Sequence, residues 1–300
     1  MFALTILGCN SAIAAYGRNP TAQALQVLDE TFLIDCGEGT QMQLARYKVK
    51  WSKISRIFIS HLHGDHYFGL PGLLSTMGLL GRSQDLHLYA PPELEDILQM
   101  QLDVTSATLP YPFYFHPITK PGVICNTQHI QVNTFPVVHG IPCWGFTFKE
   151  IRNPRRIISE RVKAYEVPSD FYSELQHGKD FVNAKGTIIP NNELTDAAPR
   201  PRTYAYCADT IYNEAMIPYI QHADLLYHET TYPAEQAELA AKRFHSTTNQ
   251  AANIAQLSKA KKLIIGHFSS RYEKLDIFLK EASAIFPDTE LAMEGTCYAL

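Results

Sequence analysis

The sequence predicts an α/β (α+β) fold in which two β-sheets pack together and helices lie on their outer sides. Its 300 residues are 46% hydrophobic, which is enough to bury a large core. Short apolar runs rich in β-branched and aromatic residues recur along the whole chain and are typical of strands. Stretches with helical spacing lie between some of these runs, which favours sheets covered by helices.

The elements are expected in alternating order along both halves of the chain. The runs that predict strands are residues 4–7, 25–28, 32–34, 56–59, 86–89, 130–135, 144–148, 203–207, 225–227 and 263–265. The patterns that predict helices are residues 40–47, 69–80, 93–102, 234–242, 249–259 and 275–286. We expect one domain over residues 1–300, with no repeats.

One region, residues 152–201, differs from the rest because its regular pattern weakens and polar residues increase. Its opening part is basic, with a single acid, Glu160, against Arg152, Arg155, Arg156, Arg161 and Lys163. Two interpretations stay open. The region is either a solvated surface insertion or an inserted, flexible basic arm that binds an anionic polymer.

Charge and cysteine usage exclude several classes of protein. The net charge is -4, so any role in nucleic-acid binding must depend on a local basic patch. The six cysteines form no CxxC pair, which argues against a disulfide scaffold or a cysteine zinc finger and favours the cytoplasm. The first ten residues resemble a strand, not a signal peptide, and no apolar run is long enough to predict a membrane span.

The strongest local signal is SHLHGDHYFGLPGLL, residues 60–74, which directly follows a predicted strand. It holds His61, His63, Asp65 and His66 within six residues. Side chains two residues apart in an extended segment point the same way, so His61 and His63 can converge on one ion. Imidazole with carboxylate suits zinc, manganese or iron. The alternative is a polar loop that contains histidines by chance. The occurrence of four ligand-capable residues within six positions disfavours it.

Three further ligand-type residues, His139, Asp209 and His267, also follow predicted strands. Working residues gather at the carboxyl ends of strands in open sheets, so these residues are expected to meet the first cluster. The other histidines lack this context and are expected to be surface or packing residues: His87, His116, His129, His177 and His222.

Seven ligands exceed the four of a single tetrahedral zinc and therefore predict two metals. One ion is expected on His61, His63 and His139, and the other on Asp65, His66 and His267, with Asp209 bridging the two. A water between paired ions loses a proton near neutral pH, so hydroxide is available to attack a phosphodiester or another electrophile.

A proton donor for the leaving group is expected at His245, just before a predicted helix in FHSTTNQAA, residues 244–252. Glu229 in YHETTY, residues 227–232, can orient it through a hydrogen bond, and His228 can support the site. A helix-start histidine without chemistry is an equally open interpretation of His245.

Taken together, these residues resemble the ribonuclease Z family of the metallo-β-lactamase superfamily. HLHGDH indicates the superfamily. Other segments match the family in order: LGCNSA, FLIDCGEGTQMQL, the isolated His139, YCADT, LLYHETTY, HSTTNQAA and GHFSSRY. Of these, DCGEGTQ, HET, HST and GHFSSRY together are much more specific to the family. The resemblance covers nearly the whole chain.

The resemblance implies a four-layer αββα sandwich, a homodimer and two zinc ions per subunit, with manganese or another divalent ion as an alternative. It implies an endoribonuclease that cuts precursor tRNA on the 3′ side of the acceptor stem, removes the trailer and leaves 5′-phosphomonoesters. Asp65 would be the proton acceptor and His245 the proton donor. Residues 152–201 occupy the place of the family's exosite arm, which clamps the tRNA elbow.

Two segments depart from the family pattern. The arm lacks the usual Gly-Pro pair in VPSDFYSELQHGKDF, residues 167–181, and the loop AIAAYGRN, residues 12–19, lacks the usual Pro and Lys. Both bear on substrate affinity and cleavage position. Two other classes stay as alternatives. The ligands alone do not exclude a metal-dependent small-molecule hydrolase such as a phosphodiesterase, lactonase or β-lactamase, and the other alternative is a non-catalytic RNA-binding protein with a structural metal site.

Overall fold

The computed structural model describes residues 2–151, 154–198 and 200–300, which form two compact units. The first unit comprises Met1–Asn126, Val132–Phe148 and Thr203–Leu300, and the second comprises Thr127–Gln131 and Lys149–Arg202. Arg152 of the predicted basic arm lies outside the described residues. No helix in the described ranges is both long and apolar enough to cross a membrane.

Two seven-stranded sheets form the centre of the first unit. The first sheet has the order β18 (Cys297–Ala299), β1 (Phe2–Gly8), β2 (Ala22–Val27), β3 (Glu30–Ile34), β4 (Ile54–Phe58), β5 (Leu86–Ala90), β6 (Phe113–Pro117). The second has the order β17 (Thr289–Leu291), β16 (Leu263–Gly266), β15 (Leu225–Glu229), β14 (Thr203–Cys207), β9 (Cys143–Glu150), β8 (Ile130–Val137), β7 (Gly122–Asn126). Strands β3 to β6 and β14 to β17 run parallel, so their carboxyl ends share one edge in each sheet.

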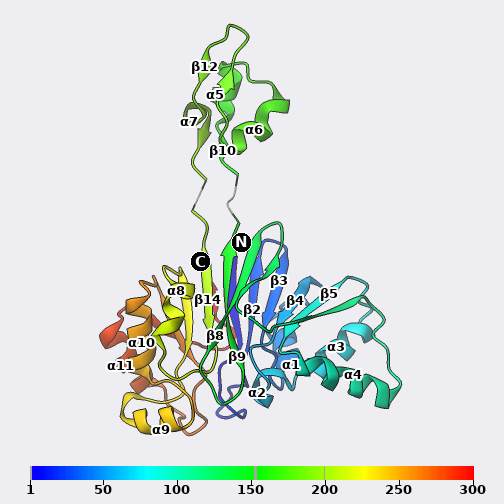
Figure 1. Cartoon of the computed structure of the whole chain (residues 1–300), viewed down its shortest axis with the longest axis vertical. Helices are drawn as coiled ribbons and strands as arrows, with labels where there is room; N and C mark the ends of the chain where they lie inside the picture. The colour runs from blue at the N-terminus through cyan, green and yellow to red at the C-terminus, as the bar shows by residue number, and fades with distance from the viewer. Residues whose placement is uncertain (1, 152–153, 199) are drawn as a thin grey trace. The chain divides into compact units, whose positions relative to one another are not determined.

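Helices cover the outer side of each sheet in the first unit, which gives the four layers (Figure 1). The helices of the first half are α1 (Thr40–Arg46), α2 (Gly64–Tyr67), α3 (Leu70–Leu79) and α4 (Glu93–Thr105), with the 3₁₀ turn η1 (Trp51–Lys53). Those of the second half are α8 (Ile217–Ile220), α9 (Ala237–Lys242), α10 (Thr248–Leu257) and α11 (Asp276–Ile285), with η3 (Glu214–Met216) and η4 (Ala234–Gln236). Leu44, Leu73 and Leu94 pack their helices onto the first sheet.

Aromatic side chains fill the space between the two sheets. The Phe58 ring of the first sheet lies 5.6 Å from Phe146 and 5.2 Å from Phe148 of the second. Phe32 and Phe148 are 6.1 Å apart, and all four side chains are buried. Tilted and edge-on contacts of this kind suit the ring quadrupoles and add to the burial of apolar surface. This core fixes the strand ends that carry the ligand-type residues.

The second unit has a small core of its own. Its elements are β10 (Arg156–Ile157), α5 (Ser159–Ala164), η2 (Ser169–Phe171), α6 (Tyr172–Gln176), β11 (Phe181–Val182), β12 (Ile188–Ile189), α7 (Asn191–Leu194) and β13 (Thr195–Asp196). β10 pairs with β13 and β11 with β12, both antiparallel. Buried Val162, Leu175 and Leu194 form its centre. The buried Asn191 amide donates to the carbonyls of Leu175 (2.8 Å) and Lys179 (2.9 Å), which ties the turns together.

The predicted strands and helices agree with the structure apart from short elements. The helix predicted over residues 234–242 is divided into η4 and α9, since the chain first forms a 3₁₀ turn after Pro233. The sequence analysis predicted none of the elements of the second unit, and it also missed strands β6, β7, β17 and β18. β17 and β18 have three residues each, too few to show an alternating pattern.

Candidate metal centre

Five strands of the first unit end at or just before the candidate residues. His61 follows β4, His139 follows β8, Asp209 follows β14, Glu229 ends β15 and His267 follows β16. His63 precedes α2, while Asp65 and His66 lie within it. Side chains far apart in the sequence therefore meet at one edge of the sandwich, as the sequence predicts. All seven predicted ligands are brought together there.

Six of the seven side chains form two groups, one on each side of Asp209, which is the seventh. Its Oδ2 lies 3.7 Å from His61 Nε2 and 3.9 Å from His139 Nε2. Its Oδ1 lies 3.5 Å from His66 Nε2 and 3.3 Å from His267 Nε2. His63 joins the first group, because its Nδ1 is 3.1 Å from His139 Nε2. One carboxylate thus faces both groups with different oxygens, which is the arrangement of a bridging ligand.

Two features indicate that this geometry fits cations. The buried Asp209 Oδ1 has no hydrogen-bond partner in the described part of the chain, and leaving such an atom without any partner is costly. Ring nitrogens also approach one another, with 3.2 Å between His61 Nε2 and His63 Nδ1 and 3.3 Å between His66 Nε2 and His267 Nε2. Converging imidazole nitrogens beside a carboxylate form a donor set suited to zinc-type ions.

The pKa shifts of His61 and His63 are opposite in direction to that of His66. Burial and the neighbouring His66 hold the pKa of His61 well below its ordinary value, and burial and His139 lower the pKa of His63. Neutral imidazole is the form that binds metals. Burial also acts to lower the pKa of His66, but Asp209, Asp35 and Asp65 outweigh it and raise that pKa well above the ordinary value. The carboxylates around His66 therefore attract positive charge.

Asp35 orients His66, although the sequence analysis assigned it no role. Asp35 is fully buried, and its Oδ2 accepts hydrogen bonds from His66 Nδ1 (2.8 Å), Ser60 Oγ (2.9 Å) and Tyr206 Oη (2.5 Å). Its Oδ1 accepts from the Ser60 amide at 2.7 Å. A proton held on Nδ1 leaves the lone pair of His66 Nε2 facing the other ligands. The position of Asp35 directly after β3 was the signal that could have identified it.

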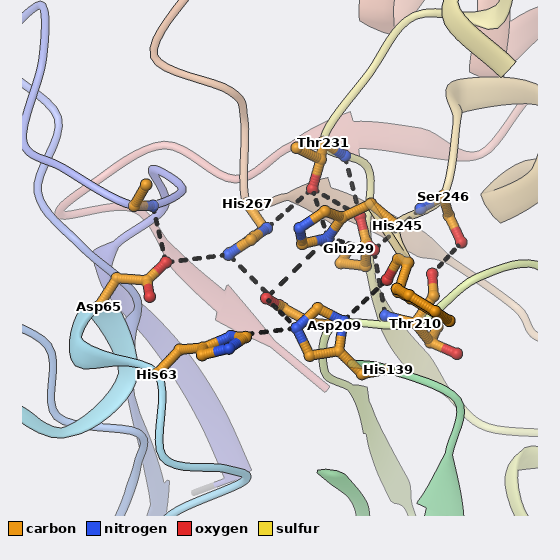
Figure 2. A network of polar contacts seen from close by, with 12 residues as sticks. His63, Asp65, His139, Asp209, Thr210, Glu229, Thr231, His245, Ser246 and His267 are labelled. Atoms are coloured by element: carbon orange, nitrogen blue, oxygen red, sulfur yellow. Dashed lines mark hydrogen bonds and ion pairs between the residues drawn. The ribbon is translucent and has the colours of Figure 1, made fainter. Parts of the chain in front are cut away.

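Asp65 and His267 are each held by a partner from another segment. The Ala12 amide donates to Asp65 Oδ2 at 2.7 Å, and His267 Nε2 lies 3.4 Å from the same oxygen (Figure 2). His267 adopts a left-handed φ of 61°, an uncommon conformation that is often found at functional sites. The residue before it must be glycine, since a Cβ on Gly266 would lie 2.3 Å from Tyr227 Oη.

A second network joins His245 to the metal centre through Glu229 and Thr231 (Figure 2). His245 Nδ1 donates to Glu229 Oε1 at 2.9 Å, so its Nε2 is the nitrogen left for proton transfer. Thr231 Oγ1 donates to Glu229 Oε2 (2.8 Å) and lies 2.9 Å from His267 Nδ1. Burial lowers the pKa of His245, but the charge of Glu229 and the hydrogen bond outweigh it and raise the pKa to about 9. A raised pKa favours the protonated form of His245 at neutral pH.

The remaining candidates lie elsewhere. His228 is buried, but it donates to the Glu229 backbone carbonyl (2.7 Å), and its Nε2 has no partner among the described residues. Neighbouring residues of a strand point to opposite faces, so His228 points away from the site that Glu229 faces and does not contact the ligands. The five other histidines are half-buried or exposed, and within the described ranges none joins a three-residue ligand group.

The basic residues of the second unit fall into two kinds. Arg156, Arg161 and Lys163 are exposed. Arg155 is half-buried, and its guanidinium donates to Thr195 Oγ1 (2.7 Å) and to the Thr195 carbonyl (3.3 Å). Arg155 therefore joins two segments of this unit, while the other three are open to solvent.

A cleft of about 520 Å³ opens onto the metal centre. It is lined by His63, Asp65, Asp209 and His245 and by parts of the 11–20 loop, with Gly64 and Phe68 of the α2 region. Ligand-type carboxylates, an imidazole of the first group and His245 thus line one cleft. The arrangement can bind an anionic substrate through bound cations and protonate its leaving group.

Solved structures define the class of protein. The human short-form tRNase Z (ELAC1) is 25% identical over 99% of this chain and 98% of its own, with a TM-score of 0.72. The metallo-β-lactamase fold protein YhfI of Bacillus subtilis has a TM-score of 0.71 at 19% identity over both full chains. The chain has the metallo-β-lactamase fold. A fold alone does not select one activity.

Sequence relatives are more specific. The ribonuclease Z of Bacteroides thetaiotaomicron is 44% identical over 301 aligned residues, which cover 100% of this chain and 95% of the relative. A family described as anti-Pycsar protein Apyc1 matches residues 2–159. The chain belongs to the ribonuclease Z family over its full length and, in residues 2–159, also to the Apyc1 family. That shared segment holds five of the seven ligand-type residues but neither Asp209 nor His267.

Proposed function

We propose that the chain is a metal-dependent endoribonuclease that cleaves precursor tRNA on the 3′ side of the acceptor stem and removes the 3′ trailer. The observation that carries this proposal is the two-sided ligand shell around Asp209, with His245 held beside it by Glu229. Full-length similarity to proteins named ribonuclease Z supports the choice of RNA as substrate.

The metal ions are proposed to be two zinc ions per subunit, with manganese or another divalent ion as an alternative. His61, His63 and His139 would hold one and Asp65, His66 and His267 the other, with Asp209 shared. When bound, such ions supply Lewis acidity that neutralises phosphodiester charge and lowers the pKa of water.

The chain's own residues would move the protons. Asp65 would accept a proton from the attacking water, and the Ala12 amide at 2.7 Å keeps its carboxylate oriented. His245 would donate its proton to the 3′ oxygen that leaves when the P–O3′ bond breaks. The water oxygen stays on phosphorus, so the released trailer carries a 5′-phosphomonoester and the tRNA a 3′ hydroxyl.

The second unit is proposed to be an arm that binds tRNA. Its support is the exposed positive charge of Arg156, Arg161 and Lys163 on a unit with its own small core. Arg152 is proposed as a further contact from the sequence alone. Arg155 is the weakest member of the predicted set, because its guanidinium is already bonded to Thr195.

The enzyme is proposed to act as a homodimer. An apolar groove of about 480 Å³ between α3 and α4 supports this proposal. Leu79 lines this groove and is 85% exposed, and exposed apolar patches commonly mark contacts between proteins. A Leu79→Glu variant should sediment as a monomer; an unchanged assembly, or a monomeric wild-type protein, would remove this interface.

The cytoplasm is the proposed location, supported by six free cysteine thiols. A small-molecule phosphodiesterase remains the second candidate, because residues 2–159 match a family with a different name and five ligands lie in that segment.

Cleavage of a precursor tRNA, mapped at nucleotide resolution with and without a chelator, tests the proposal. We expect one cut after the acceptor stem, loss of cleavage in chelator, recovery on adding zinc or manganese, and no product from an Asp209→Ala control. A protein that binds two divalent ions and hydrolyses a small diester but leaves precursor tRNA intact would establish the second candidate instead.

A further inference from the structure

We propose that Phe68 is a stacking platform for a nucleobase next to the scissile phosphate. The inference rests on the proposed function, since it assigns the exposed aromatic surface of the metal cleft to the RNA substrate. It concerns substrate positioning and adds no step to the chemistry.

The lining of the cleft motivates the assignment. Most of its residues are ligands, small residues or polar residues. Among the described residues that line it, Phe68 and Ile13 are the large exposed apolar side chains, at 62% and 60% exposure. Covering an exposed phenyl ring is favourable, and a substrate that enters this cleft to reach the metal centre is in a position to cover it.

The Phe68 ring is held in place before any substrate binds. It lies directly against Gly64, because a Cβ on that glycine would lie 2.3–2.7 Å from three atoms of the ring. The Tyr67 ring packs edge-on at 5.0 Å, and the Phe68 amide donates to the Gly64 carbonyl at 3.0 Å. A ring fixed in this way loses little entropy when a base stacks on it.

The position of Phe68 in the chain determines which part of a substrate its ring can contact. Phe68 follows Asp65 by three residues and His66 by two, in the same helical turn and its C-cap. A base on this ring therefore belongs to a nucleotide beside the phosphate at the metal centre. Stacking tolerates every base, because each has a π-face, and this suits an enzyme whose trailer sequences differ between substrates.

The experiment is a double-mutant cycle that combines the Phe68→Leu substitution with removal of one base from the RNA substrate. Wild-type and variant enzymes cleave a precursor tRNA and two copies that are abasic at the nucleotide 5′ or 3′ of the scissile phosphate. Stacking lost by alanine substitution corresponds to about 5- to 150-fold in affinity, and leucine keeps part of the contact, so we expect KM to rise about tenfold with kcat little changed. Phe68→Trp should retain the wild-type KM.

The abasic substrates decide the outcome. On one of them the Phe68→Leu effect should disappear, and that substrate identifies the stacked base. A Tyr219→Leu variant, which removes an exposed aromatic side chain outside the cleft, should behave as wild type. Equal Phe68→Leu effects on all three RNAs, or no effect, would overturn the platform while leaving the endonuclease proposal intact. A wild-type enzyme that cuts none of the RNAs would overturn both.

Discussion

The metal centre and the second unit hold their charged side chains in opposite ways. At the centre, His61, His66, Asp209 and Glu229 are at most 2% exposed, and Asp35 and Thr231 orient the imidazoles. In the second unit, Arg156, Arg161 and Lys163 are open to solvent.

The difference follows from what each region must do. Metal binding and proton transfer depend on fixed distances, so their residues need a rigid frame with partners that set each tautomer. Attraction of a polyanion acts over a Debye length of about 8 Å and tolerates mobile side chains. Substitutions at the centre should therefore alter chemistry, while those in the second unit should alter substrate binding.

The largest effect is expected from Asp209→Ala. Because its two oxygens face both ligand groups, the variant should lose both ions and all cleavage activity. Metal analysis by mass spectrometry, with unfolding followed by circular dichroism, checks this. One ion retained in full would show that Asp209 does not bridge, and a variant that binds both ions would contradict the ligand assignment.

His245→Ala should slow cleavage by about 10²- to 10⁴-fold, the contribution typical of a general acid. Metal content should stay near the wild-type value, because the Nδ1 of His245 is already bonded to Glu229. Single-turnover rates and metal content, measured on the same preparation, separate the two roles. Loss of an ion together with activity would make His245 a ligand, a role that its nearness to Asp209 and His267 also allows.

Residues 152–199 should be removable without damage to the centre. Glu150 and Arg202 at the base are already paired, with 2.9 Å between the Glu150 amide nitrogen and the Arg202 carbonyl and 2.8 Å between Arg202 Nε and Glu150 Oε2. A short glycine-serine turn can therefore replace the segment. We expect a loss of about 100-fold in kcat/KM on precursor tRNA, carried by KM, and unchanged hydrolysis of a small phosphodiester. Equal losses on both substrates would mean that the deletion harms the centre.

The pH dependence should report the proton on His245. Its pKa is raised to about 9, and only the protonated form donates, so kcat/KM should fall as the pH rises through about 9. Glu229→Gln removes the charge that raises this pKa, so the fall should begin at lower pH, because burial alone lowers the pKa. The pH profile of His245→Ala serves as the control and should lack this fall; its persistence there would assign the titration to another group.

The same contrast explains how far the sequence could predict the molecule. The meeting of the ligand-type residues was predictable because His61, His139, Asp209 and His267 each follow a strand, and strand ends gather at one edge whatever the details of packing. Asp35 was missed because its partner, His66, is 31 residues away and a single aspartate after a strand has many possible roles. The core of the second unit was missed because Val162, Leu175 and Leu194 follow no helical or strand period.

The smallest effect is expected from the basic side chains of the second unit, where three exposed residues can be compared with the half-buried Arg155. Changing Arg156, Arg161 and Lys163 to glutamine should weaken tRNA binding about tenfold and reduce the slope of log affinity against log salt by about 2 to 3, since each phosphate contact releases a counterion. Arg155→Gln should change that slope little and instead lower the stability of the second unit, because its guanidinium joins the start of the segment to Thr195. Filter binding across a salt series and hydrogen exchange of the segment measure the two effects. If Arg155→Gln reduces the salt slope as strongly as the triple variant, Arg155 contacts RNA despite its hydrogen bonds to Thr195. The exposure of a basic side chain would then not determine whether it binds RNA.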